Sequence, residues 1–190
     1  MKRSSVFVSL CVCFLAAVNS QVIINSPCQN VTIEQNFDLP RYLGRWYEYR
    51  RFFTFFELNG KCVTATYSDN LNGTIEVRNY QVDSNTNVSD VIVGYASQNS
   101  DTDEGKLIVT FPTAGSDGDY WILDTDYDKY SVVWSCSTSG DQSVQFSWIL
   151  TREIEPSAAT LAAIDSVVAA NGLASEKYLP VDQINCPPNP

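Results

Sequence analysis

Eight short runs rich in β-branched and aromatic residues constrain the fold of this 190-residue chain more than any other feature. Clusters of Asp, Asn, Gly and Ser separate the runs, and such clusters are typical of tight turns. Evenly spaced short strands indicate a sandwich or a barrel. The hairpin-short connections favour an all-β fold, an eight-stranded antiparallel up-and-down barrel. The predicted strands span residues 45–53, 62–68, 74–82, 89–97, 106–112, 119–125, 129–137 and 143–152.

Alternation within the runs gives the predicted barrel wall one apolar face and one wet face. Asn79 and Gln81 nevertheless share the parity of Ile75 and Val77. A packed core would reject these two amides, whereas a cavity that opens to solvent could hold them. Parity predicts these interior side chains: Phe52, Val77, Asn79, Gln81, Ile92, Val109, Phe111, Tyr120, Ile122, Phe146 and Trp148.

A single α-helix is predicted after the last strand. Residues 157–170 are rich in Ala, and Leu161, Ile164 and Val168 share one face. Pro156 suits the first helical turn, and Asn171 followed by Gly172 provides a left-handed stop. The narrow apolar face is expected to pack against the outside of the barrel.

The first 20 residues have the pattern of a cleaved secretory signal peptide. Lys2 and Arg3 precede an apolar stretch over 6–18, which is too short to span a bilayer comfortably. We expect cleavage near Ser20, which leaves 21–190 as one domain with a net charge of −12. The C-terminus carries no hydrophobic tail, so neither a transmembrane nor a lipid anchor is expected.

Composition excludes several classes of function. The whole chain has 12 basic and 22 acidic residues, which argues against binding to nucleic acid. It contains no His, so His-ligated metals and a Ser-His-Asp triad are excluded, and no catalytic residue or metal site is predicted.

Four cysteines remain beyond the signal peptide. Cys28, Cys62, Cys136 and Cys186 predict two disulfides in a secreted chain, and spacing leaves all three pairings open. Asn30, Asn72 and Asn87 each begin an N-glycosylation sequon in a turn-like context.

Three motifs occur in a fixed order along the predicted strands. Gly44-Arg45-Trp46 opens the first strand, Thr125-Asp126-Tyr127 follows the sixth, and Arg152 closes the eighth. Together they resemble the lipocalin family, and the flanking residues resemble its apolipoprotein D and insect bilin-binding branch. We expect these motifs to form a structural clasp. Gly44 would permit a tight entry, Trp46 would plug the base with Arg152 over its ring, and Thr125-Asp126-Tyr127 would close the turn beside them. The resemblance implies disulfides Cys28–Cys136 and Cys62–Cys186.

The resemblance implies a secreted carrier that holds a small hydrophobic ligand non-covalently. The suggested ligands are a bilin such as biliverdin, or else a fatty acid, retinoid, sterol or carotenoid; no cofactor is required. Glu48 shares the parity of Trp46 and is expected to face inward, either toward the ligand or in a pair with a neighbouring cation. An isomerase-like enzyme would need a free thiol or an acid/base pair in the cavity.

The Phe-rich segment 52–58 supports a second interpretation. Four Phe in five positions on a loop predict contact with something apolar, and Phe55 and Phe56 are expected at the cavity mouth. The segment is either a lid over a ligand or a surface for lipid, a receptor or self-association, and the sequence leaves an oligomer open.

Overall fold

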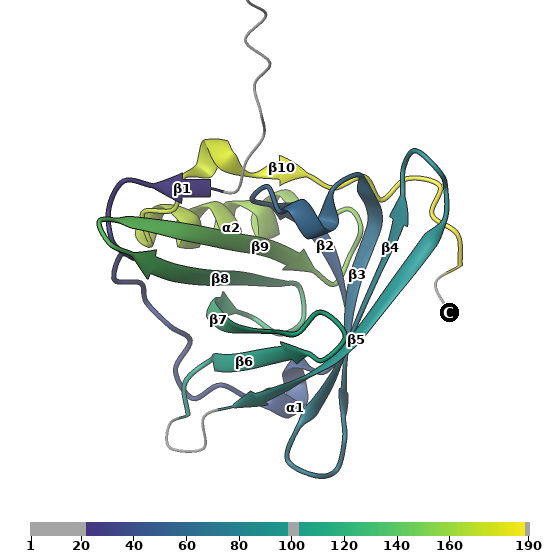
Figure 1. Ribbon diagram of the computed structural model, residues 1–190, viewed down its shortest axis with the longest axis horizontal. Coiled ribbons are helices and arrows are strands. Elements are labelled where there is room, and N and C mark those ends of the chain that lie inside the picture. Colours follow the sequence, from purple (N-terminus) through teal and green to yellow (C-terminus); the bar gives the residue numbers. More distant parts are fainter. Residues whose placement is uncertain (1–21, 99–102, 189–190) are drawn as a thin grey trace, which may run out of the picture.

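Eight antiparallel strands close into a barrel in the computed structural model, which describes residues 22–98 and 103–188. Each strand pairs with the next, and β9 pairs back with β2 to close the sheet (Figure 1). The predicted fold class is confirmed. The predicted signal peptide lies outside the described residues. The barrel strands are β2 (Gly44–Arg51), β3 (Gly60–Asp69), β4 (Ile75–Asp83), β5 (Ser89–Gln98), β6 (Lys106–Phe111), β7 (Ser116–Thr125), β8 (Tyr130–Ser139) and β9 (Gln142–Thr151).

Several short elements were not predicted from the sequence. Strand β1 (Val22–Ile24) adds to β9, and β10 (Leu179–Pro180) adds to β2. Helix α1 (Leu39–Tyr42) lies below the closed end of the barrel (Figure 1). Two 3-10 turns, η1 (Phe55–Glu57) and η2 (Ser175–Lys177), complete the chain. Elements of two to four residues are too short to show a hydrophobic period, so tertiary contacts define them.

The predicted helix is α2 (Ala158–Ala170), which packs on the outside of β8. The Ser157 hydroxyl caps its start by accepting a hydrogen bond from the Thr160 amide at 3.2 Å. Pro156 therefore precedes the cap and lies outside the first turn where it was predicted. Ile164 and Val168 are buried against the barrel, as their shared face predicts.

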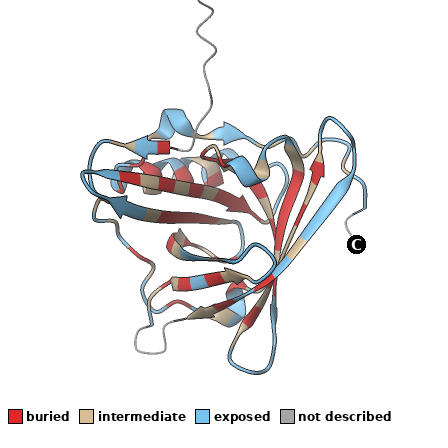
Figure 2. Cartoon of the chain, viewed as in Figure 1, coloured by how far each residue is buried: buried red, intermediate tan, exposed pale blue. Residues whose placement is uncertain are grey.

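Two large apolar cores result from this arrangement, beside a small cluster of Cys62, Tyr80 and Val82. One fills the closed end of the barrel around Tyr42 and Trp46. The other lies between the barrel wall and α2, where Trp134 and Ile149 meet Ile164. Buried and more exposed residues alternate along β6, as expected for a wall with two different faces (Figure 2).

A β-bulge in β2 decides which side chains face inward after it. The pairing with β9 shifts between Glu48 and Arg50, so Tyr49 is an extra residue and the alternation reverses. Arg51 consequently faces inward, opposite Trp148, and Phe52 faces outward. The ring of Phe52 is fully buried in the outer core, with its centroid 4.6 Å from that of Tyr178. The prediction of Phe52 as an interior residue was wrong because the parity argument assumed an unbroken strand.

Candidate ligand-binding cavity

A cavity of about 610 Å³ occupies the barrel above its filled base. It opens at the end where η1 and the loop around Ala114 lie. Apart from Phe52 and Ile122, the side chains predicted to contact a ligand line this cavity. They are Glu48, Phe55, Phe56, Val77, Asn79, Gln81, Ile92, Val109, Phe111, Tyr120, Phe146 and Trp148.

Ile122 faces inward but lies below the cavity. It is fully buried in the core at the closed end, together with Trp46 and Leu107. Parity identifies the face of a strand but not the height along the barrel, so the sequence could not separate base-filling residues from cavity-lining ones.

The three sequence motifs meet at the closed end. The guanidinium carbon of Arg152 lies 3.6 Å from the centroid of the Trp46 ring. Arg152 also donates hydrogen bonds to the carbonyl oxygens of Arg45 at 2.8 Å and Leu43 at 2.9 Å. Gly44 has φ +96°, and a Cβ there would lie 3.3 Å from Arg152 Nη1. This clasp seals the base and makes no contact with the cavity.

The turn after β7 supports the same end. The Asp126 carboxylate accepts hydrogen bonds from the amides of Lys129 at 2.7 Å and Tyr130 at 3.1 Å. The Thr125 hydroxyl donates to the Tyr130 carbonyl at 2.6 Å and accepts from the Tyr127 amide at 3.0 Å. The Tyr127 carbonyl accepts from Arg152 Nε at 3.0 Å, which links this turn to the clasp.

A series of aromatic rings runs from the mouth into the cavity. Phe56 contacts Phe146 at 5.9 Å between ring centroids, and Phe146 stacks on Trp148 at 5.9 Å with 11° between the planes. Trp148 in turn stacks on Tyr120 at 6.4 Å. Such a wall offers broad π faces to a flat or ring-containing ligand.

Phenol groups form the cavity floor. The Tyr67 hydroxyl lies 2.7 Å from that of Tyr120, which lies 3.1 Å from that of Tyr42, and the Ser131 hydroxyl ends the chain 3.0 Å from Tyr42. Burial raises the pKa of Tyr42 to about 12 and that of Tyr67 and Tyr120 well above 10. The floor is therefore polar and uncharged. Sequence reasoning missed Tyr67, although it has the same parity along β3 as Val63 and Ala65, which also line the cavity.

A buried charged cluster holds the loop at the mouth. Arg51 donates from Nη1 to Glu48 Oε1 at 2.5 Å and from Nη2 to the Glu57 carbonyl at 2.7 Å. The Glu57 carboxylate accepts from the Thr54 hydroxyl at 2.6 Å and from Trp148 Nε1 at 3.3 Å. Burial, and then the nearby Glu57 charge, raise the pKa of Glu48 well above its usual value, against the attraction of Arg51. The structure shows Glu48 in an ion pair with Arg51, and the same residue also lines the cavity.

Two amides on β4 line the wall without full hydrogen bonding. The side-chain carbonyl oxygens of Asn79 and Gln81 are buried and have no hydrogen-bond partner in the described part of the chain. Gln81 Oε1 lies so close to Gly60 that a Cβ there would come within 2.5 Å of it. A side chain at Gly60 would therefore require the Gln81 amide to move.

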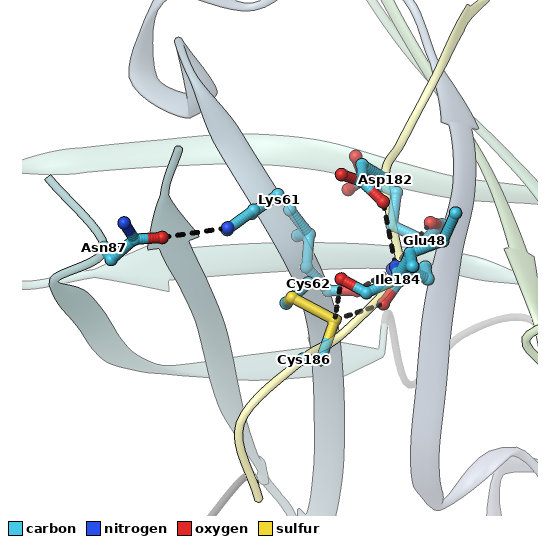
Figure 3. The surroundings of a disulfide bond; sticks show 9 residues. Glu48, Lys61, Cys62, Asn87, Asp182, Ile184 and Cys186 are labelled. Carbon is cyan, nitrogen blue, oxygen red and sulfur yellow. Dashed lines mark hydrogen bonds between the residues drawn. A yellow bond between two sulfur atoms is a disulfide. The ribbon is translucent and has the colours of Figure 1, made fainter. Parts of the chain in front are cut away.

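Two disulfides tie the irregular ends to the barrel. Cys28 pairs with Cys136 and Cys62 with Cys186, as the resemblance implied. The second bond anchors the C-terminal segment beside β3, where the Cys62 amide donates to the Asp182 carbonyl at 2.7 Å (Figure 3). Every cysteine within the described residues is thus bonded. Those residues also contain no cluster of His, Cys, Asp and Glu suited to a metal, and no helix long and apolar enough to cross a membrane.

The sequon residues Asn30, Asn72 and Asn87 are all exposed. Asn87 Oδ1 accepts a hydrogen bond from Lys61 Nζ at 2.9 Å (Figure 3). None of the three asparagines lines the cavity, so a glycan at any of them would project away from it.

Comparison with known proteins agrees with this architecture. The family model for the lipocalin and cytosolic fatty-acid binding protein family matches residues 43–185. The chain belongs to the lipocalin family. Apolipoprotein D of Mus musculus is 37% identical to this lipocalin over 161 residues, which cover 84% of each chain. The Lazarillo protein of Schistocerca americana is 39% identical over 160 residues, covering 82% of this chain and 74% of that one.

Among solved structures, insecticyanin from the tobacco hornworm Manduca sexta superposes on this lipocalin with a TM-score of 0.75. The two sequences are 22% identical, and the superposition covers 86% of this chain and 89% of that one. At this identity the match supports the fold alone. The family and the cavity together establish a general role in binding small hydrophobic molecules.

Proposed function

We propose that this lipocalin is a secreted, non-catalytic carrier that holds one small hydrophobic molecule non-covalently in its barrel. The observation that carries the proposal is the aromatic-lined cavity of about 610 Å³ above a sealed base. A volume of this size is typical of small-molecule pockets. A bilin, fatty acid, retinoid, sterol or carotenoid is the ligand class that the resemblance suggests.

Other features of the chain support secretion and non-covalent binding. The signal-like N-terminus and the exposed sequons suit an extracellular protein, as do two disulfides. Because Cys28, Cys62, Cys136 and Cys186 are all paired, they leave no thiol for a thioether-linked pigment or for thiol catalysis.

The proposal can be tested on protein purified from its natural source. Native mass spectrometry is expected to show one small molecule per chain, and denaturation is expected to release it intact. An absorption band in the red would identify a bilin. A protein that carries nothing and takes up no hydrophobic probe would overturn the carrier function.

Tryptophan fluorescence provides a test in solution. A hydrophobic chromophore bound in the cavity is expected to quench Trp148, which lies in its wall. Trp148→Phe should remove most of this quenching. Trp121→Phe is the matched control, because Trp121 packs in the outer core with Trp134. Equal loss in both variants would place the chromophore outside the barrel.

The exposed rings at the mouth support a second candidate, an interaction protein. Phe55 is 66% exposed and Phe56 50% exposed. If this surface binds lipid, a receptor or another copy of the chain, Phe55→Ser with Phe56→Ser should abolish association and leave ligand affinity unchanged. The opposite result would assign the loop to the carrier function.

A further inference from the structure

Among the described residues, every charged side chain that lines the cavity is acidic. Five carboxylates contribute to its described lining, and neither Lys nor Arg does. They come from β2, η1, β5 and β7, so acidic groups lie around the cavity rather than on one side, although buried Glu48 is paired with Arg51 and contributes least to the charge at the mouth. These residues are Glu48, Glu57, Asp90, Asp117 and Asp119.

The nearest buried cation is already neutralised. Arg51 bonds to Glu48 on one side, and Glu57 accepts from it through its carbonyl oxygen and lies 3.6 Å from Arg51 Nε through its carboxylate. A ligand carboxylate could pair with Arg51 only by displacing one of these carboxylates, which would leave that group buried beside the newcomer. Lys61 lies close by on β3, but its ammonium contacts Asn87 and does not line the cavity (Figure 3).

The polar groups deeper in the cavity carry no charge. The floor presents the hydroxyls of Tyr67 and Tyr120, which burial keeps protonated. The wall presents the amides of Asn79 and Gln81. Such groups hydrogen-bond a ligand hydroxyl or carbonyl, but they cannot repay the desolvation of an anion.

We propose that this cavity selects an uncharged hydrophobic molecule, bearing at most hydroxyl or carbonyl groups, over any carboxylate. The inference rests on the proposed carrier function and narrows its ligand class. It places neutral retinoids, sterols and carotenoids ahead of fatty acids, and ahead of bilins, whose propionates are anionic. A carboxylate entering this mouth would lose its water and meet an excess of acidic groups, since Arg51 is already bonded to Glu48 and Glu57.

A matched pair of probes tests this selection. Retinol and retinoate share one skeleton and differ in the charge of the head group, so cavity size cannot separate them. Titration of the full mature chain at neutral pH, followed by tryptophan quenching, is expected to give at least about tenfold tighter binding of retinol. Hexadecanol and hexadecanoate, competing with the neutral dye Nile red, provide a second pair with a different skeleton.

Charge variants identify the cause of the preference. Asp90, Asp117 and Asp119 are exposed, so replacing all three by Asn should leave the fold intact. This triple variant is expected to bind retinoate more tightly and so to reduce the ratio of retinol affinity to retinoate affinity. The control replaces Asp103, Glu155 and Glu176 by their amides, which changes the net charge equally at exposed positions outside the cavity lining.

The outcomes separate the inference from the carrier function. Equal or tighter binding of the carboxylate in both pairs would overturn the inference and leave the carrier function standing. An equal gain of retinoate affinity in the two triple variants would also overturn it, since net charge would then be the cause. If no member of either pair binds, the carrier function itself fails and the inference fails with it.

Discussion

The guanidinium carbon of Arg152 lies 3.6 Å above the centroid of the Trp46 ring, and the same group donates to the carbonyl oxygens of Leu43 and Arg45. The first and last strands of the barrel are joined by this contact across 106 positions of sequence. The stacked guanidinium keeps all its polar edges free to donate, so one side chain seals an apolar plug and satisfies backbone groups. The closed end of the barrel depends on this pair, and the ligand cavity lies above it.

Removing the guanidinium should weaken the whole fold. Arg152→Ala loses the stacking and leaves several carbonyl oxygens without donors, so we expect the free energy of unfolding to fall by about 2–4 kcal/mol. Urea denaturation measures this change. Arg45→Ala is the matched control, since the exposed Arg45 side chain takes no part in the clasp and should change stability by less than about 0.5 kcal/mol. Similar losses in both variants would contradict the assigned role.

Gly44 should not tolerate a side chain. Its φ of +96° strains any other residue, and a Cβ would press on Arg152 Nη1. Gly44→Ala is therefore expected to cost about 1–3 kcal/mol. Gly118→Ala should be nearly neutral, because a Cβ there meets nothing within 4 Å and its φ lies outside the left-handed region. Thermal unfolding of the two variants side by side tests the difference.

Because of the bulge in β2, we predict different effects on stability when Phe52 and Phe55 are truncated. Phe52 is fully buried in the outer core beside Tyr178, so Phe52→Ala should destabilise the protein by about 3–5 kcal/mol. Phe55 is mostly exposed at the mouth, so Phe55→Ala should leave stability almost unchanged. Chemical denaturation distinguishes the two. A small effect at Phe52 would mean that its ring faces the open cavity, as the unbroken alternation predicted.

The contribution of Glu48 to the stability of the folded protein should fall as pH rises. Its pKa is raised in the folded state, so between the unfolded value near 4.5 and the higher folded value the native state binds more protons. The stabilisation that Glu48 contributes below pH 4.5 is lost as the pH rises through that window. Wild type should therefore lose stability relative to Glu48→Gln as pH increases above 4.5, measured by urea unfolding at several pH values.

Glu104 provides a control of opposite sign. Its hydrogen bond from Lys106, followed by that from Gln35, lowers its pKa, so the carboxylate stabilises the protein above the unfolded pKa. Wild type should gain stability relative to Glu104→Gln as pH rises toward neutrality. If wild type also gained stability relative to Glu48→Gln as pH rose, the raised pKa of Glu48 would be disproved.

Residue alternation alone identified most of the cavity wall. Val77, Val109 and Phe146 lie where an ideal antiparallel barrel would place them, because side chains on regular strands must point alternately to its two sides. The same argument found Asn79 and Gln81, whose amides mark the change from packed base to hollow cavity. It failed at Phe52, where one extra residue reversed the alternation, and at Ile122, where the face was right but the height was wrong.

The sequence by itself determined the barrel, its outer helix and the clasp motifs, because these follow from period, turn chemistry and short local patterns. Only the tertiary structure decided the chemistry of the cavity. Arg51, Glu48 and Glu57 lie within ten consecutive residues, yet their pairing depends on a bulge that exists only against β9. The ring of carboxylates at the mouth likewise gathers from distant strands. Charges interact through space, so the net charge around the cavity is fixed only when the barrel closes.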